Sequence, residues 1–244
     1  MIEVVDGRGS VVRRFSSRDE AETIDASGLP YPTYWFRPPQ RVATEAGHHR
    51  IAWDLRYAPP PGAQRQFSIA AIYRNTPSGP VGPFAHPGRY TVRLAVDGAV
   101  MERPIDVRLD PRVLVSAEDL QLQTDLSLAC YQAYLKAQQL RAAIDGALTR
   151  EGGGANAARR AAWASLVGSG IPGDPDILYG SISAAPVDEE TVAGLQEKLL
   201  FMLNLLQAAD ARPTSQARDA VSALQKTLEA LEKRWASLRI GPGV

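Results

Sequence analysis

PGRYTVRLAVDGAVMERPIDVRL, at residues 87–109, alternates apolar and polar side chains on both sides of Asp97-Gly98. Such alternation has the period of a strand with one buried face. Asp-Gly between two alternating runs is a strong hairpin signal, because the two turn positions need a backbone conformation that Asp and Gly tolerate. The stretch therefore predicts two antiparallel strands, at residues 90–96 and 101–109, joined by a tight turn.

A further strand is predicted upstream, at residues 49–57. Its alternation places Ile51, Trp53, Leu55 and Tyr57 on one face and charged side chains on the other. The three consecutive prolines that follow end the strand, because proline cannot donate to a central ladder.

A second hairpin is predicted at the N-terminus, where short β-branched runs flank Asp-Gly-Arg-Gly at residues 6–9. Together these signals give about five to seven strands. We expect them to form an open antiparallel β-sandwich of immunoglobulin-like type over residues 1–112, with long proline-rich loops. The order of the strands does not follow from the sequence.

After the second strand pair the apolar period changes from two to about three and a half. A helix is predicted from Ser116, whose hydroxyl suits an N-cap, to about Thr149. Two more helices are predicted at residues 192–209 and 217–238, where apolar residues recur every three or four positions. The pattern predicts an antiparallel three-helix bundle over residues 113–240, so the chain is expected to be α+β in two domains.

The connections between these helices differ in character. Residues 210–214 predict a tight turn in which Pro213 suits the first turn of the last helix. Residues 150–187 are interpreted as a loop insertion at one end of the bundle, because they contain three consecutive glycines and several prolines. Within the insertion, residues 156–167 are a short amphipathic helix candidate.

Charge and composition limit the classes of partner. The chain has 27 basic and 27 acidic residues, and 15 of the basic and 12 of the acidic ones precede residue 113. This balance argues against nucleic acid as a partner, since phosphate binding needs a concentrated basic face. All the basic residues before residue 113 are arginines, which leaves open either an anion-recognition surface of bidentate arginines or a bias in amino-acid usage.

The single cysteine, Cys130, excludes an intrachain disulfide and a thiolate metal site, and is interpreted as a small buried or half-buried side chain.

No apolar run in the sequence approaches the ~20 residues that span a bilayer. The first six residues have neither the charged nor the apolar region of a signal peptide. We therefore expect no membrane span, and a cytoplasmic protein if the chain is complete as given.

Neither predicted domain carries a recognisable catalytic constellation. The three histidines lack the spacing of metal ligands. Glu118-Asp119 and Glu189-Glu190 are interpreted as charges at helix N-termini rather than acid–base pairs, and Asp174-Pro175-Asp176 as a proline turn rather than a calcium loop. Serine-nucleophile, phosphate-loop and dinucleotide motifs are absent. We therefore predict no catalytic residue, no metal ligand and no cofactor, and expect no enzyme activity.

An aromatic run, Tyr34-Trp35-Phe36, is followed by Arg37 in a long connection. These four residues are the candidate binding surface, because clustered rings can form a platform for carbohydrate or peptide. The alternative is that the rings, with Trp53, plug the sandwich core or the seam between the domains.

Several blocks of sequence resemble a known family. They are Tyr34-Trp35-Phe36-Arg37, Ala46-Gly47-His48-His49-Arg50-Ile51-Ala52-Trp53-Asp54-Leu55-Arg56-Tyr57, Gly82-Pro83, Pro87-Gly88-Arg89-Tyr90-Thr91-Val92-Arg93-Leu94 and Asp110-Pro111-Arg112-Val113. In this order they resemble the C-terminal region of bacterial sortilin-like, BNR-repeat propeller proteins, which are often labelled glycosyl hydrolases. Residues 206–214 and Trp235 resemble the helical tail of the same proteins, so the resemblance covers nearly the whole chain.

The resemblance implies an immunoglobulin-like domain similar to that of flagellar hook-capping proteins, which a large β-propeller precedes in the family. It therefore implies a non-catalytic accessory or interaction module that supports or orients a propeller and contacts other proteins. The module would be secreted or periplasmic if it is the tail of an exported protein. Two alternatives stay open: a module that binds glycan or peptide through residues 34–36, and a fragment of a glycoside hydrolase whose active site lies outside this chain.

Overall fold

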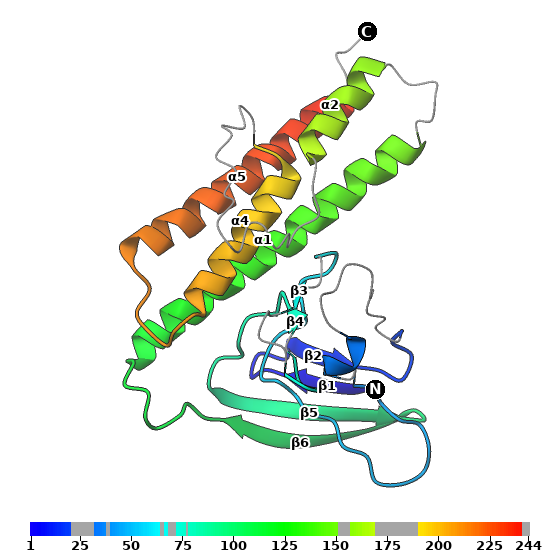
Figure 1. Cartoon of the computed structure of the whole chain (residues 1–244), viewed down its shortest axis with the longest axis vertical. Coiled ribbons are helices and arrows are strands. Elements are labelled where there is room, and N and C mark those ends of the chain that lie inside the picture. Colours follow the sequence, from blue (N-terminus) through cyan, green and yellow to red (C-terminus); the bar gives the residue numbers. More distant parts are fainter. Residues whose placement is uncertain are drawn as a thin grey trace. The chain divides into compact units, whose positions relative to one another are not determined.

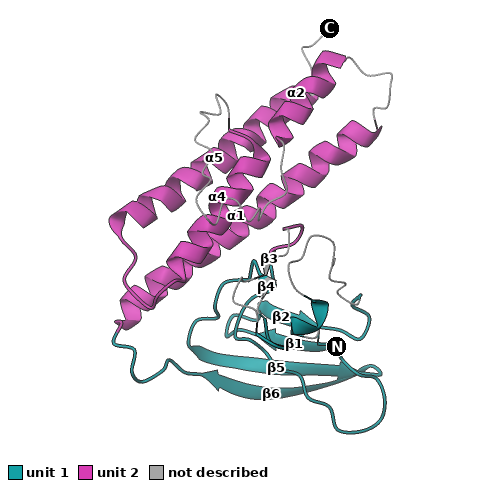
Figure 2. Cartoon of the chain, in the orientation of Figure 1, with its two compact units in different colours: residues 1–59, 65–114 teal, residues 60–64, 115–244 magenta. Residues whose placement is uncertain are grey.

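The computed structural model describes residues 1–20, 32–37, 40–63, 66–67, 72–76, 78–150, 157–168 and 190–240 (Figure 1). The chain divides into two compact units (Figure 2). We call residues 1–59 and 65–114 the strand unit, and residues 60–64 and 115–244 the helical unit. The expected α+β class is confirmed, since one unit carries an antiparallel sheet and the other carries helices.

The main sheet of the strand unit has four antiparallel strands in the order β2-β1-β5-β6. They are β1 (Ile2–Val5), β2 (Val11–Phe15), β5 (Gly88–Val96) and β6 (Ala99–Val107). Both predicted hairpins are confirmed, since β1 pairs with β2 and β5 pairs with β6. In the second hairpin Asp97 and Gly98 have φ of 48° and 83°. A two-residue hairpin turn of type I′ requires positive φ at both positions.

Two further short strands, β3 (Gln66–Phe67) and β4 (Ser78–Gly79), form a separate antiparallel pair. The described strands of the unit therefore form one four-stranded sheet and one two-stranded sheet. An immunoglobulin-like sandwich is not confirmed by this arrangement.

The core of the strand unit lies on one face of the main sheet. Its buried members are Val4, Val12, Ala85 and Tyr90, with Trp53, Tyr57 and Val107 packed half-buried against them. The rings of Trp53 and Tyr90 meet edge to face, with centroids 5.5 Å apart. Tyr90 also donates its hydroxyl to the carbonyl of His86 at 2.6 Å, so the buried phenol is satisfied.

The predicted strand at residues 49–57 is wrong. Leu55 has φ of 58° and is 40% exposed, so the alternating face is interrupted. The indole of Trp53 donates to the carbonyl of Arg56 at 2.9 Å, which turns the chain locally. This segment instead crosses the core as irregular chain, and the Tyr57 amide donates to the carbonyl of Pro83 at 2.9 Å.

Alkaline pH is expected to weaken the strand unit through Tyr90. Burial, with smaller contributions from Tyr57 and Asp6, raises the pKa of Tyr90 to about 12. A tyrosine in an unfolded chain ionises near pH 10. Because the folded unit holds the proton more tightly, this contribution to stability is complete below about pH 10 and is lost as the pH rises to about 12. Urea unfolding across this range should show a steeper loss for the native chain than for Tyr90→Phe, and equal slopes would contradict the assignment.

The described part of the helical unit contains four helices: α1 (Ala117–Arg150), α2 (Ala157–Val167), α4 (Val192–Leu206) and α5 (Ser215–Ile240). The three predicted long helices correspond to α1, α4 and α5. Ser116 caps α1 as predicted, since its hydroxyl accepts from the Asp119 amide at 3.1 Å. Pro213 lies before α5 rather than in its first turn, because Thr214 is the capping residue and accepts from the Ala217 amide.

The short helix predicted at residues 156–167, within the region interpreted as a loop insertion, is confirmed as α2, but it packs into the helical unit. This helix contacts α1, α4 and α5, and its Trp163 is only 2% exposed. The ring of Trp163 meets that of Trp235 on α5 edge to face, with centroids 5.2 Å apart. The described helical unit is therefore built from four packed helices instead of the predicted three.

Polar side chains join α1 to α4 inside the helical unit. Gln196 on α4 is fully buried and donates to the amide oxygen of Gln138 on α1 at 2.6 Å. Near the other end of α4, the amide of Gln123 donates to the carbonyls of Leu206 and Ala209. Buried amides need such partners, so these bonds fix the position of α4 along α1. Tyr134 on α1 donates in turn to the carbonyl of Pro61 at 2.9 Å.

Candidate functional site

Three aromatic rings of the strand unit lie together at its surface. Tyr34 and Tyr73 are 60% and 58% exposed, while Trp35 is half-buried. The ring centroids are 6.5 Å apart for Tyr34 and Trp35, 6.1 Å for Tyr34 and Tyr73, and 5.9 Å for Trp35 and Tyr73. We call these three residues the ring cluster. Soluble proteins bury most large rings, so a contiguous exposed cluster is a candidate binding site.

A short helical turn positions the first two rings. It is the 3-10 helix η1 (Thr33–Trp35), which follows proline in an extended conformation. Phe36 comes next and is only 4% exposed, so its side chain anchors the turn from below. The Phe36 amide donates to the carbonyl of Thr33 at 3.1 Å and closes the turn. The turn therefore presents Tyr34 outward while Phe36 points inward.

A compact loop, Ile72 to Thr76, positions the third ring. Thr76 is 1% exposed, and its hydroxyl accepts from the Ile72 amide and donates to the Ile72 carbonyl, both at 2.9 Å. The Asn75 amide also donates to the Ile72 carbonyl at 2.9 Å. A main-chain bond from the Thr76 amide to the Trp35 carbonyl, 3.1 Å, ties this loop to η1. Two segments far apart in the sequence are thus joined at one surface.

Two arginines flank the ring cluster. The Nε of Arg37 donates to the side-chain oxygen of Asn75 at 2.9 Å, which is a second tie between the two segments. The guanidinium of Arg74 lies 5.7 Å from the centroid of the Tyr73 ring, within cation–π range. Both side chains belong to exposed residues. No ion pair joins either arginine to a carboxylate among the residues that the structure describes.

The predicted site residues are only partly brought together. Tyr34, Trp35 and Arg37 lie at the ring cluster, but Phe36 is buried beneath it and cannot contact a ligand there. Trp53 lies apart, in the core beside Tyr90. Trp53 packs against the core of the strand unit and Phe36 is buried, whereas Tyr34 is exposed at the surface.

Sequence reasoning missed Tyr73 and Arg74. They stand in the pentapeptide Ile-Tyr-Arg-Asn-Thr at residues 72–76, which reads as part of an irregular segment. Asn followed by Thr is common where side chains bond to nearby main chain, and this was the available signal for a closed loop. The partnership with η1 has no signal in the sequence, because it rests on a main-chain bridge between residues 36 and 76.

Thr76→Val is expected to loosen this loop. The substitution preserves shape but removes the hydroxyl, so the Ile72 amide loses its acceptor and the Ile72 carbonyl keeps only the bond from the Asn75 amide. Breaking such bonds at a buried site costs about 1–3 kcal/mol. Amide hydrogen exchange at Ile72 and Asn75 should accelerate, while exchange in β5 stays unchanged. Unchanged exchange at Ile72 would contradict the role given to the hydroxyl.

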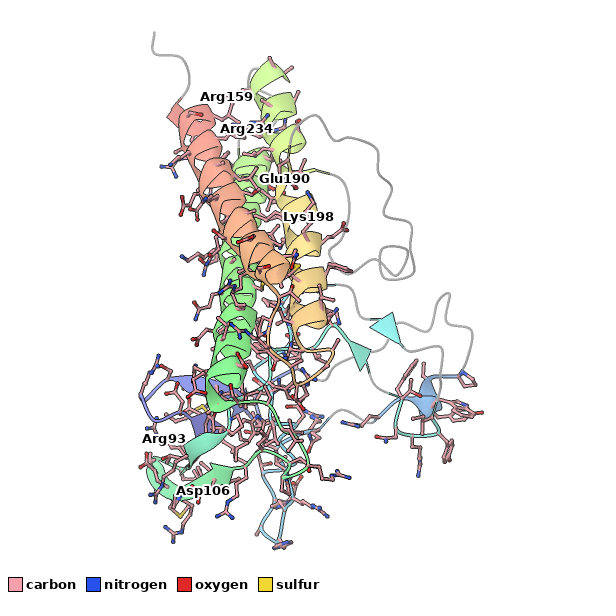
Figure 3. The ribbon with its side chains drawn as sticks, turned by 90° about the vertical axis from the view of Figure 1, so that its left-hand side faces the viewer. Arg93, Asp106, Arg159, Glu190, Lys198 and Arg234 are labelled. Atoms are coloured by element: carbon pink, nitrogen blue, oxygen red, sulfur yellow. The ribbon has the colours of Figure 1, made fainter. Side chains whose placement is uncertain are left out.

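Several other charged groups of the described chain form ion pairs within their own unit. Arg93 on β5 pairs with Glu102 on β6 at 2.8 Å and with Glu3 on β1 at 3.4 Å. At the start of α4, Glu190 pairs with Lys198 at 2.6 Å, and Figure 3 labels both residues. Glu189 and the predicted turn at residues 174–176 lie outside the described residues.

Within the described ranges, no group of three or more histidine, cysteine or carboxylate side chains is placed to hold a metal ion. None of the described helices is both long enough and apolar enough to cross a bilayer.

No family model, no curated protein and no solved structure matches this chain. The class that the fold and the site define is a two-unit α+β protein with an exposed aromatic and arginine surface.

Proposed function

We propose that this chain is a non-catalytic interaction module that binds a protein partner through the ring cluster, Arg37 and Arg74. The observation that carries the proposal is the set of residue types at this surface, together with the contacts that hold their two segments in place. Tyr, Trp and Arg are the side chains that contribute most to protein interfaces. Their segments are closed by buried Thr76 and anchored by Phe36, so little side-chain and loop entropy would be lost on binding.

The resemblance to sortilin-like propeller proteins supports the same class of function. In that setting the strand unit would be an immunoglobulin-like domain and the module would support or orient a β-propeller. The native mass of the product in source cells tests this part. A band several times larger than the 26.4 kDa of this chain, detected with an antibody to it, would favour a propeller or a glycoside hydrolase upstream. A band at that size would count against both.

Site-specific photo-cross-linking tests the partner contact itself. A photoreactive phenylalanine analogue replaces Tyr34 in one variant and Phe201 in a matched control, which is an exposed ring on α4 in the helical unit. We expect a discrete cross-linked species from position 34 in cells, its loss when Tyr73→Ala is added, and its absence from position 201. The same products from both positions, or none from position 34, would contradict the proposal.

Glycan binding is the second candidate, because a sugar can stack on the face of an exposed aromatic ring. Titration with neutral oligosaccharides, followed by tryptophan fluorescence, separates the two. If the partner is a protein, we expect no saturable change in tryptophan fluorescence on addition of these oligosaccharides. A saturable change that Trp35→Phe abolishes would favour the glycan function.

A further inference from the structure

We infer that the ligand of the ring cluster is an acidic, proline-containing segment of a protein. This inference rests on the proposed function and specifies its ligand. It follows from three features of the site: two arginines that no described carboxylate pairs with, the angles between the rings, and the backbone conformation of Arg74.

The charge at the site favours an acidic ligand. Among the described residues of η1, the Ile72–Thr76 loop and Arg37 there are two arginines and no acidic side chain. Arg37 uses its Nε on Asn75, which orients the guanidinium and leaves the two terminal nitrogens to face a ligand. Paired terminal N–H groups match a carboxylate in a bidentate arrangement. A partner carrying Asp or Glu would therefore complete the surface.

The ring angles favour a peptide over a sugar. The planes of Tyr34 and Trp35 are tilted by only 31°, and the Tyr73 plane stands at 90° to that of Trp35 and at 67° to that of Tyr34. Because the Tyr73 ring stands at a steep angle to the other two, the three rings do not form a flat platform. A compact apolar side chain such as proline can contact rings on two sides in this arrangement. Proline-rich segments dock into aromatic-lined grooves in this way and lose little entropy because their conformation is already extended.

The backbone of Arg74 supports a role in binding. Its φ is 58°, in the left-handed region where glycine and asparagine are comfortable and other residues are strained. The chain nevertheless places a long cation there, directly after an exposed ring. Strained positions of this kind cluster at binding sites, where the side chain is used.

Fluorescence anisotropy with defined peptides tests the inference on the full chain. The probe is a labelled decapeptide of alternating proline and glutamate, compared with matched proline–glutamine and proline–lysine peptides and with an oligogalacturonate. The variants are Arg37→Ala and Arg74→Gly, the latter because glycine adopts the φ of Arg74 without strain. Arg108→Ala removes an exposed arginine elsewhere in the strand unit and is the control.

We expect the glutamate peptide to bind about fivefold more tightly than the glutamine peptide, and each site variant to remove about that factor. The glutamine peptide should not respond to the variants, the lysine peptide should bind worst, and Arg108→Ala should change nothing. Added salt should weaken only the glutamate peptide.

Three results would overturn the inference: equal binding of the glutamate and glutamine peptides, binding of the oligogalacturonate without the peptides, or binding of no probe. None of them bears on the cross-link from position 34. That cross-link decides separately whether the ring cluster contacts a protein at all.

Discussion

Trp163→Ala is expected to lower the free energy of unfolding of the helical unit by about 4 kcal/mol. The indole is 2% exposed and belongs to a short helix that depends on tertiary contacts, because eleven residues are too few for a stable isolated helix. Truncation removes the edge-to-face contact with Trp235 and the hydrogen bond from the indole to the Leu238 carbonyl, 3.4 Å. It also leaves a cavity among packed helices. The buried side chains of Leu166 and Val167 and the bond from Arg160 to the Leu148 carbonyl are not removed by this substitution.

Cys130 provides the measurement. It is 1% exposed on α1, and burial raises the pKa of its thiol to about 12, so the native chain should react slowly with thiol reagents. Labelling in a urea series then reports opening of the helical unit alone. The midpoint should fall sharply in Trp163→Ala and barely move in Phe201→Ala, which truncates a ring of the same unit that is 46% exposed. Similar midpoints for the two variants would show that α2 contributes little to the unit.

Prediction from sequence succeeded where the signals are local. Asp97-Gly98 specifies its own turn geometry, so the β5–β6 hairpin follows without knowledge of the rest of the fold. Ser116 likewise provides its own cap, and the apolar repeats of α4 and α5 identify their buried faces.

Prediction failed where a tertiary contact overrides the pattern. Residues 49–57 alternate, yet Leu55 turns outward, and the segment is held instead by main-chain bonds to residues 83 and 85. The pattern at residues 156–167 predicts an amphipathic helix but not its place in the core, because its partner Trp235 lies far along the sequence. The same limit applies to the ring cluster, because Tyr73 comes from a loop that meets residues 34–37 only through contacts between segments far apart in the sequence.

Gly82→Ala is expected to destabilise the strand unit by about 3 kcal/mol. A Cβ at this position would press into the carbonyl oxygens of Tyr57 and Ala58. These are main-chain atoms, so no side-chain rotation relieves the contact. The carbonyl of Gly82 also accepts from the guanidinium of Arg56 at 2.9 Å, and that guanidinium stacks over the Phe84 ring at 3.4 Å. Separating the two backbones would therefore disturb several contacts together.

Hydrogen exchange gives the local readout for Gly82→Ala. The amides of Tyr57 and Ala85 bond across the two segments, at 2.9 Å to Pro83 and 2.7 Å to Leu55. Their protection should fall by about a hundredfold, which corresponds to about 3 kcal/mol. Gly7→Ala is the matched control, because a Cβ there meets open space. Protection that survives in Gly82→Ala would mean that the two segments can separate without cost, and the irregular chain at residues 49–57 would then need another explanation for its fixed path across the core.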